Sequence, residues 1–271
     1  MPESSKTLSI SIMSGKGGVG KTNIALNLAY SLSAQSYSTI LVDCDLGLAN
    51  LDVLLGVSPG KNLEDLLQPE TDFNQVLVRL PDSELDFLPA ASGVPELADW
   101  DNNLQTILFS KLNEHFKAYD LLLLDLGAGV SSTVVSLASM TRVRVVVISA
   151  EPTSLTDGYA LIKVLATKKK LNHFFIVVNK VSSHQEGETA FNRLSSACEK
   201  FLDIRIDLLA VIPEDRAVVE AVMRQAPLYR QAPESRAYKE IEGLASKMVR
   251  LRQRLPDEYA NPLNIEVRGG K

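Results

Sequence analysis

Residues 15–22 constrain this chain more than any other segment, because they read Gly-Lys-Gly-Gly-Val-Gly-Lys-Thr. They match the pattern G-x-x-x-x-G-K-S/T and lie between an apolar run at residues 8–13 and a helical pattern at residues 23–34. Glycines let the backbone curl so that successive N–H groups face phosphate oxygens, and the following helix adds the positive end of its dipole. The sequence therefore predicts a phosphate-binding loop, made by Gly15, Lys16, Gly17, Gly18, Val19, Gly20, Lys21, Thr22 and Asn23.

The rest of the chain alternates apolar, β-branched runs with helical stretches. Runs with few polar residues are typical of parallel strands buried on both faces, and the alternation is typical of βαβ units. We expect an α/β fold in a single domain over residues 1–271, a doubly wound and mostly parallel sheet with helices on both faces. The expected strands are 8–13, 39–42, 85–88, 121–124, 143–149, 174–178 and 208–212, and the expected helices include 23–34, 103–117, 155–168 and 189–201.

Composition excludes several other classes of protein. Of 271 residues, 45% are hydrophobic and 23% charged, which fits a folded globular chain rather than a disordered or fibrous one. The apolar runs are far shorter than the roughly 20 residues that span a bilayer, and no secretory signal precedes them, so a cytoplasmic location is expected. Cys44 and Cys198 are too few and too far apart for a disulfide framework or a metal cluster, and we expect two buried thiols.

Charge is spread unevenly along the chain. The net charge of -5 argues against an overall grip on nucleic acid, so no strong nucleic-acid binding is expected. Residues 64–101 contain ten acidic residues against one basic residue, Arg79, and are interpreted as a solvated face, with a partner-docking surface as the alternative. The basic residues 168–170 are interpreted as a solvated helix end.

Two residues of the loop carry side chains suited to phosphate and metal. Lys21 is expected to meet the β and γ phosphates, and Thr22 to place its hydroxyl on Mg²⁺. In phosphate-loop enzymes the metal also needs an acid at the end of a buried strand. Asp125 ends the apolar run 121–124 and is the candidate for that acid.

Lys16 marks a deviant form of the loop, K-G-G-x-G-K-S/T, and through it the chain resembles the MinD/ParA class of dimeric ATPases. Residues 42–45, 125–129 and 179 match further motifs of that class in the same order. The resemblance implies a phosphate-loop NTPase that binds ATP and Mg²⁺ and hydrolyses ATP. It also implies an ATP-dependent homodimer, in which Lys16 reaches across to the partner's nucleotide.

The same resemblance implies roles for residues beyond the loop. Asp45 would position the attacking water, and Asp43 would support Mg²⁺ and the water network. Gly127 and Gly129 would sense the γ-phosphate, because their backbones flex without a Cβ.

The base is constrained by residues 179–182, which read Asn-Lys-Val-Ser. Guanine-specific phosphate-loop proteins use N-K-x-D, whose aspartate accepts hydrogen bonds from guanine. Serine removes that carboxylate, so the resemblance implies adenine, with Asn179 near the base and Pro213 in the adjacent loop. Lys180 alone is equally consistent with a surface charge.

Four segments are more similar to the FlhG/FleN branch of this class than to MinD, namely residues 43–56, 88–93, 127–129 and 151–160. The branch implies regulation of flagellar number or placement through the flagellar GTPase FlhF, a flagellar transcription activator or a switch-complex protein. Some members stimulate FlhF through an N-terminal D-Q-A-x-x-L-R element, but only residues 1–6 precede the first expected strand. A contact of that kind is therefore not expected.

Residues 240–255 are expected to form a C-terminal amphipathic helix. The resemblance gives such a helix a peripheral contact with the inner face of the cell membrane, but a helix packed on the domain has the same pattern. Apolar and basic residues recur on separate faces: Ile241, Leu244, Met248, Leu251 and Leu255 on one, and Lys247, Arg250 and Arg254 on another.

Other functions stay open from the sequence. A MinD-type septum-site ATPase and a ParA-type partitioning ATPase share the motifs, although partitioning calls for a basic DNA surface. A biosynthetic ATP-dependent enzyme shares the loop but needs a further substrate pocket or a Cys/His pair.

Overall fold

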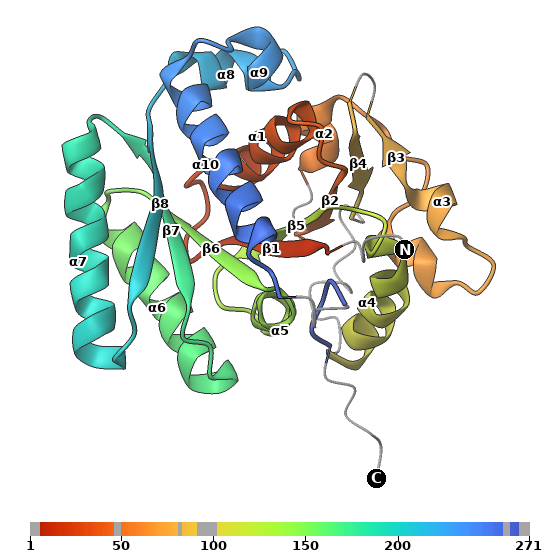
Figure 1. The fold of residues 1–271 in the computed structure, drawn as a ribbon, viewed down its shortest axis with the longest axis horizontal. Coiled ribbons are helices and arrows are strands. Elements are labelled where there is room, and N and C mark those ends of the chain that lie inside the picture. The colour runs from red at the N-terminus through yellow and green to blue at the C-terminus, as the bar shows by residue number, and fades with distance from the viewer. Residues whose placement is uncertain (1–5, 46–49, 81–82, 91–101, 257–260, 266–271) are drawn as a thin grey trace.

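The strands of this protein form one sheet, in the order β3-β4-β2-β5-β1-β6-β7-β8 (Figure 1). The computed structural model describes residues 6–45, 50–80, 83–90, 102–256 and 261–265. All neighbouring strands are parallel except β3, which is antiparallel to β4. The strands are β1 (Leu8–Ser14), β2 (Thr39–Cys44), β3 (Val78–Arg79), β4 (Leu85–Leu88), β5 (Leu121–Ala128), β6 (Val143–Ile148), β7 (Phe174–Val181) and β8 (Ile206–Pro213).

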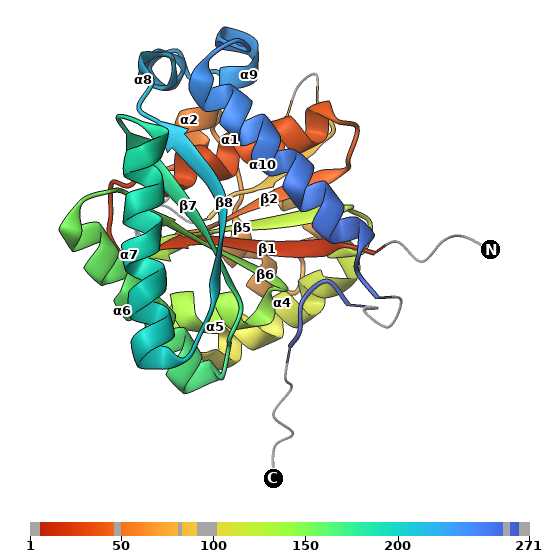
Figure 2. The same ribbon diagram turned by 60° about the vertical axis from the view of Figure 1, so that its left-hand side comes forward.

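Helices cover both faces of the sheet, so the expected doubly wound α/β fold is confirmed. Figure 2 shows α1 (Lys21–Ala34) and α10 (Arg236–Gln253) on one side of β1 and α5 (Ser132–Met140) on the other. Each face has its own apolar core, one centred on α1 and α10 and one on α5 and its neighbours. The neighbouring helices on the second face are α4 (Asn102–Phe116), α6 (Pro152–Lys169) and α7 (His184–Leu202).

Strand β5 shows why a leucine run forms a central strand. Leu121 and Leu123 enter the core beneath α1, whereas Leu122 and Leu124 enter the opposite core, as the alternation of side chains along a strand requires. All four leucines are fully buried. A strand with apolar residues on both faces can therefore exist only between two helical layers.

Several short elements were not expected from the sequence. They are α2 (Leu51–Leu55), the 3-10 helix η1 (Leu63–Leu67), α3 (Phe73–Val76), β3, α5, α8 (Arg216–Met223) and α9 (Leu228–Gln231). Within the acidic stretch, Asp65 and Asp72 cap η1 and α3 through backbone N–H groups, a structural use that fits the solvated-face interpretation. Residues 81–82 and 91–101 of that stretch, and residues 46–49 and 91–93 of the FlhG-like segments, lie outside the described residues.

Helix α10, which contains most of the expected C-terminal helix, packs on the domain in this structure. Its apolar face lies against α1 and β8, and Ile241, Leu244 and Met248 are at most 1% exposed. Ser235 caps the helix by accepting a hydrogen bond from the Tyr238 backbone N–H, so the helix begins four residues earlier than expected. The apolar face of α10 is therefore packed on the domain. No helix among the described residues is long and apolar enough to cross a bilayer.

Candidate functional site

The predicted phosphate loop lies at the carboxyl end of β1 and leads directly into α1. Gly18 and Gly20 have φ angles of 80° and 91°, a left-handed backbone that glycine adopts without steric cost. Gly15 lies against α6, where an added Cβ would be only 2.1 Å from the carbonyl oxygen of Asp157. The glycines therefore serve two different needs, curvature within the loop and close contact with a neighbouring helix.

Two side chains from the end of β7 hold the loop from outside. The Nδ2 of Asn179 donates a hydrogen bond to the carbonyl oxygen of Val19 at 2.8 Å, and the Nζ of Lys180 donates to that of Gly18, also at 2.8 Å. An added Cβ at Gly20 would lie 2.4 Å from the Nδ2 of Asn179. Asn179 was expected near the base, and its amide nitrogen is here engaged with the loop.

Lys21, Thr22 and Asp125 come together as the sequence predicted. The Nζ of Lys21 lies 2.7 Å from the Oδ1 of Asp125 and 3.1 Å from the Oγ1 of Thr22, and both charged side chains are almost fully buried. Burial raises the pKa of the Asp125 carboxyl, and the charge and hydrogen bond of Lys21 oppose that rise. The Lys21 ammonium, which is the group that would also bind phosphate, thus favours the ionised form of Asp125 against the effect of burial.

Asp43 lies beside Asp125, because the two are paired in the register of β2 and β5. Its oxygens accept hydrogen bonds from the backbone N–H groups of Asp45 and Leu51. Burial, and then the nearby charge of Asp125, raise the pKa of Asp43 to about 7. The carboxyl groups of Asp43 and Asp125 are thus buried together beside Lys21, and this arrangement favours the binding of a further cation.

These acids and Thr22 suit Mg²⁺, which prefers hard oxygen ligands. Among the described residues no group of three or more His, Cys, Asp or Glu side chains is arranged to hold a metal. Mg²⁺ commonly binds through one or two carboxylates together with substrate phosphates. Thr22, Asp43 and Asp125 could therefore hold the ion when phosphate oxygens complete its shell.

Asp45 meets the segment that was expected to sense the γ-phosphate. A Cβ added to Gly127 would lie 3.3 Å from the Oδ1 of Asp45, so the carboxylate rests against the backbone of that glycine. Gly129 has a φ of 94°, and its N–H donates to the carbonyl oxygen of Ser14 at the end of β1. The end of β5 is thus joined to both the phosphate loop and Asp45.

Lys16 turns out of the loop toward α6. Its Nζ lies 2.5 Å from the Oε2 of Glu151 and 3.0 Å from the Oγ1 of Thr153. The hydrogen bond and charge of Lys16 lower the pKa of Glu151. The lysine that the resemblance assigns to a partner's nucleotide therefore has a partner within its own chain.

The remaining predicted residues lie around the loop. Val19 has its side chain in the core beneath α1, so only its backbone is available to a ligand of the loop. Asn23 accepts a hydrogen bond from Asn27, one turn later in α1. Pro213 at the end of β8 is paired with Val181 of β7, and Val181 is close in sequence to Asn179. Both cysteines are free and buried, as expected.

Sequence reasoning missed the roles of Glu151, Thr153 and Lys180. Glu151 and Thr153 follow the carboxyl end of β6, and Lys180 is the last residue but one of β7, so strand-end position was the signal available. A cavity of about 270 Å³ beside the loop is lined by Lys16, Glu151 and Lys180, among others.

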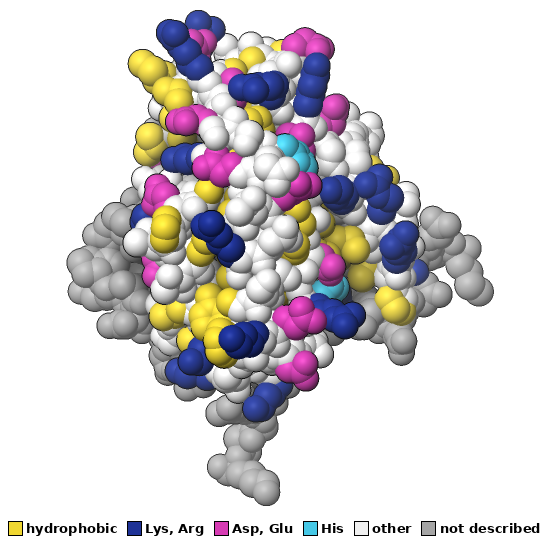
Figure 3. All heavy atoms as spheres, turned by 90° about the vertical axis from the view of Figure 1, so that its left-hand side faces the viewer, with side chains coloured by type: hydrophobic (Ala, Val, Ile, Leu, Met, Phe, Trp, Pro, Cys, Tyr) yellow, Lys and Arg dark blue, Asp and Glu magenta, His cyan; other side chains and the backbone are white. Residues whose placement is uncertain are grey.

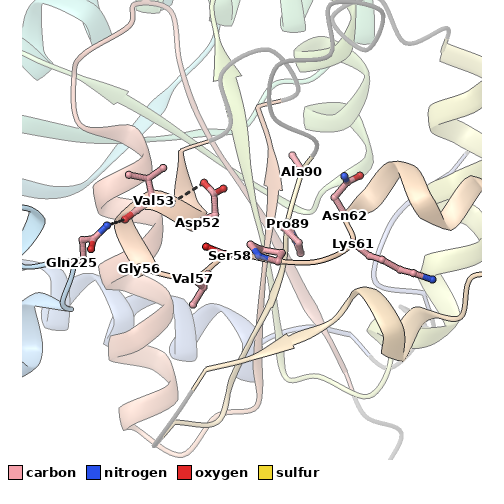
Figure 4. A pocket seen from close by; sticks show the side chains of 11 residues that line it. Asp52, Val53, Gly56, Val57, Ser58, Lys61, Asn62, Pro89, Ala90 and Gln225 are labelled. Carbon is pink, nitrogen blue, oxygen red and sulfur yellow. Dashed lines mark hydrogen bonds between the residues drawn. The ribbon is translucent and has the colours of Figure 1, made fainter.

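A second cavity, of about 620 Å³, lies away from the loop, between α2 and the end of β4 (Figure 4). Asp52, Gly56, Lys61 and Pro89 line it, and the Nε2 of Gln225 donates to the carbonyl oxygen of Val53 at its edge. The Nζ of Lys61 is engaged by Gln75. The side chains of Lys61 and Gln225 are thus engaged with the protein itself, and the predicted phosphate-binding residues lie at the loop rather than here.

The parallel sheet, the loop between β1 and α1, and the acids at the ends of β2 and β5 define a phosphate-loop nucleotide-binding protein. The chain belongs to the family described as the CobQ/CobB/MinD/ParA nucleotide binding domain, whose model matches residues 10–228. The predicted membership of the MinD/ParA class is confirmed.

Similar proteins include two flagellar ones. The antiactivator FleN of Pseudomonas aeruginosa is 36% identical over 239 residues, which cover 88% of this chain and 85% of FleN. The flagellum site-determining protein YlxH of Helicobacter pylori is 30% identical over 243 residues, 89% of this chain and 81% of YlxH. These likenesses confirm the predicted similarity to the FlhG/FleN branch.

Solved structures of MinD share the fold. The cell division ATPase MinD of Pyrococcus furiosus has a TM-score of 0.76 and 28% identity, covering 90% of this chain and 99% of that one. The septum site-determining protein MinD of Pyrococcus horikoshii, complexed with Mg-ADP, has a TM-score of 0.75 and 26% identity, covering 92% and 100%.

Proposed function

We propose that this protein is an ATP-driven dimeric switch that regulates flagellar number or placement. The observation that carries the proposal is Lys16, an additional lysine in an otherwise regular phosphate loop, which points out of the loop and is 37% exposed. A lysine that served its own nucleotide would point inward, as Lys21 does. The likeness to FleN and YlxH supports the flagellar role.

In this proposal each residue has one task. The loop amides and Lys21 bind the phosphates of ATP, while Thr22, Asp43 and Asp125 hold Mg²⁺, which would neutralise charge on the phosphates. Asp45, resting on Gly127, orients the attacking water. When ATP binds, Lys16 leaves Glu151 and contacts the nucleotide of a second copy of the chain. After hydrolysis, Lys16 returns to Glu151.

Molar mass in solution tests the switch. With Asp45→Ala to block hydrolysis, light scattering with ATP and Mg²⁺ should give about twice the 29.6 kDa of one chain. Lys16→Ala in the same background should bind ATP but remain monomeric, whereas Lys163→Ala, an exposed lysine on α6, should still dimerise. A monomer at all ATP concentrations in the Asp45→Ala variant would refute the proposal.

Flagellar counts test the biological role. The chain would be expressed in Pseudomonas aeruginosa lacking FleN, and flagella per cell counted by electron microscopy. The wild-type chain should restore the normal number, and Lys21→Ala, which cannot hold phosphate, should not. Restoration by both would show that nucleotide plays no part.

Two competing functions have separate assays. Random duplex DNA should not bind in the presence of ATP, since the net charge is -5 and, on the face viewed in Figure 3, Lys and Arg side chains are interspersed with Asp and Glu. Lipid vesicles should sediment the protein only if α10 can leave the core, and its packing argues against this. ATP-dependent DNA binding that falls with salt would instead favour a partitioning ATPase.

A further inference from the structure

Lys180 has an unusual backbone for its side chain. Its φ of 57° lies in the left-handed region, which is less favourable than the right-handed one for a residue with a Cβ. The β7–β8 register shifts between Asn179 and Val181, on either side of it. Strained residues of this kind persist where the surroundings fix them, and they gather at functional sites.

The strained backbone directs the lysine onto the phosphate loop. Its Nζ donates to the carbonyl oxygen of Gly18, and the neighbouring Asn179 donates to that of Val19. In a trans peptide the C=O and the following N–H point in opposite directions. Holding the Gly18 oxygen on the outside therefore aims the Val19 N–H toward the other side of the loop, and holding the Val19 oxygen does the same for the Gly20 N–H.

The acidic side chains beside Lys180 accept their hydrogen bonds from other groups, although the charge of Lys180 helps to lower the pKa of Glu151. Glu151 is engaged by Lys16, and the Oε2 of Glu186 accepts hydrogen bonds from the N–H and hydroxyl of Ser182. These are the acidic side chains that line the cavity next to the loop with Lys180.

We propose that Lys180 is a positioning residue for nucleotide phosphate binding. It fixes the peptide between Gly18 and Val19 so that the amide of Val19 faces the phosphates before they arrive. The inference rests on the proposed nucleotide-binding function and extends it to a residue outside the loop. The ammonium acts through the loop backbone, so its loss weakens binding while the fold persists.

A glycine substitution at position 180 separates the effect of the lysine side chain from the effect of the strained backbone. Lys180→Gly removes the ammonium but adopts the same backbone more easily, so thermal unfolding should occur at the same temperature or higher. The dissociation constant for Mg-ADP, measured by calorimetry, should rise about three- to tenfold, the range expected for an exposed, charge-assisted hydrogen bond. Lys180→Arg keeps a cationic donor and should bind within about twofold of wild type.

Lys170 is a matched control. It is also an exposed lysine with a φ of 57°, but it is the C-cap of α6, at the opposite end of that helix from Glu151 and Thr153, which Lys16 of the loop contacts. Lys170→Gly should share any gain in thermal stability and bind Mg-ADP as wild type does. Equal affinity of wild type and Lys180→Gly, or an equal loss in Lys170→Gly, would overturn the positioning role. Failure of the wild type to bind Mg-ADP at all would be a different result, refuting the nucleotide switch itself.

Discussion

Gly15→Ala should destabilise the protein through one steric contact. An alanine Cβ would lie 2.1 Å from the carbonyl oxygen of Asp157, 2.2 Å from its carbonyl carbon and 2.8 Å from the Gly158 nitrogen. Non-bonded carbon–oxygen contacts are about 3.3 Å or longer, so the loop and α6 would have to separate by about 1 Å. Both sides resist this, because the obstructing atoms are helix backbone and Leu161 anchors α6 in the core.

Overpacking of this kind costs about 1–3 kcal/mol. For a domain of this size, that corresponds to a fall of roughly 2–12 °C in the unfolding temperature. The measurement is thermal unfolding by circular dichroism in nucleotide-free buffer, so that lost ligand binding does not contribute. Gly17→Ala is the control, because no atom lies within 4 Å of its added Cβ.

Gly17→Ala should unfold at the wild-type temperature or slightly above it, since alanine restricts the unfolded chain. The reasoning fails if Gly15→Ala unfolds within 1 °C of wild type, or if Gly17→Ala falls as far. Either result would mean that the loop is not pressed against α6 as the structure shows.

Three further substitutions test the buried charges and the packed helix. Lys21→Ala leaves Asp125 buried without its cation and should lower the free energy of unfolding by about 3–5 kcal/mol in urea titrations, a loss that adding Asp125→Asn should largely reverse. Asp43→Asn should raise that free energy by at least ~1 kcal/mol at pH 8 without metal, since the raised pKa of Asp43 means that folding disfavours its ionised form. This gain should shrink as the pH falls from about 7 and vanish only below the ordinary pKa of 3.8, where Asp43 is protonated in both states, and a constant gain would refute the electrostatic cause. Leu244→Ala should cost about 2–5 kcal/mol, whereas a negligible cost would mean that α10 is loosely attached.

Buried strands could be placed from the sequence because their apolar signal is local. Strand β4 was expected at residues 85–88 and is found there, and β5 begins where its leucine run begins. Its end at Ala128 was missed, because Asp125 and the glycines after it break the apolar pattern while pairing with β1 and β2 continues. Short helices such as α2 and α3 span too few residues to show a period.

The fate of the C-terminal helix could not be read from its pattern. A helix that packs on a core and one that lies on a membrane both present one apolar face, so residues 240–255 fit either. The difference lies in α1, whose buried residues lie in the same apolar core as the apolar face of α10. That partner is about 200 residues away in the chain, and spacing within the helix contains no information about it.

The functional site likewise has residues that the sequence could predict and contacts that it could not. The loop and Asp125 were predictable because a motif and a strand end identify them, but the holding contacts of Asn179 and Lys180 depend on how β7 lies beside β6 and β8. From the sequence alone, Lys180 looks like an ordinary surface lysine. Only its left-handed backbone and its hydrogen bond to the Gly18 carbonyl oxygen, both seen in the structure, set it apart.

The buried charges imply that nucleotide and Mg²⁺ bind together. Lys21 is the cation that neutralises Asp125 in this structure, and the same ammonium is expected on the phosphates. When Lys21 turns to phosphate, Asp125 and Asp43 remain in a space where burial already raises the pKa of both carboxyls. A divalent cation at Thr22, Asp43 and Asp125 would replace the charge that Lys21 withdraws. Phosphate binding without the metal would leave two buried carboxylates with a weakened partner, so each ligand should increase the affinity for the other.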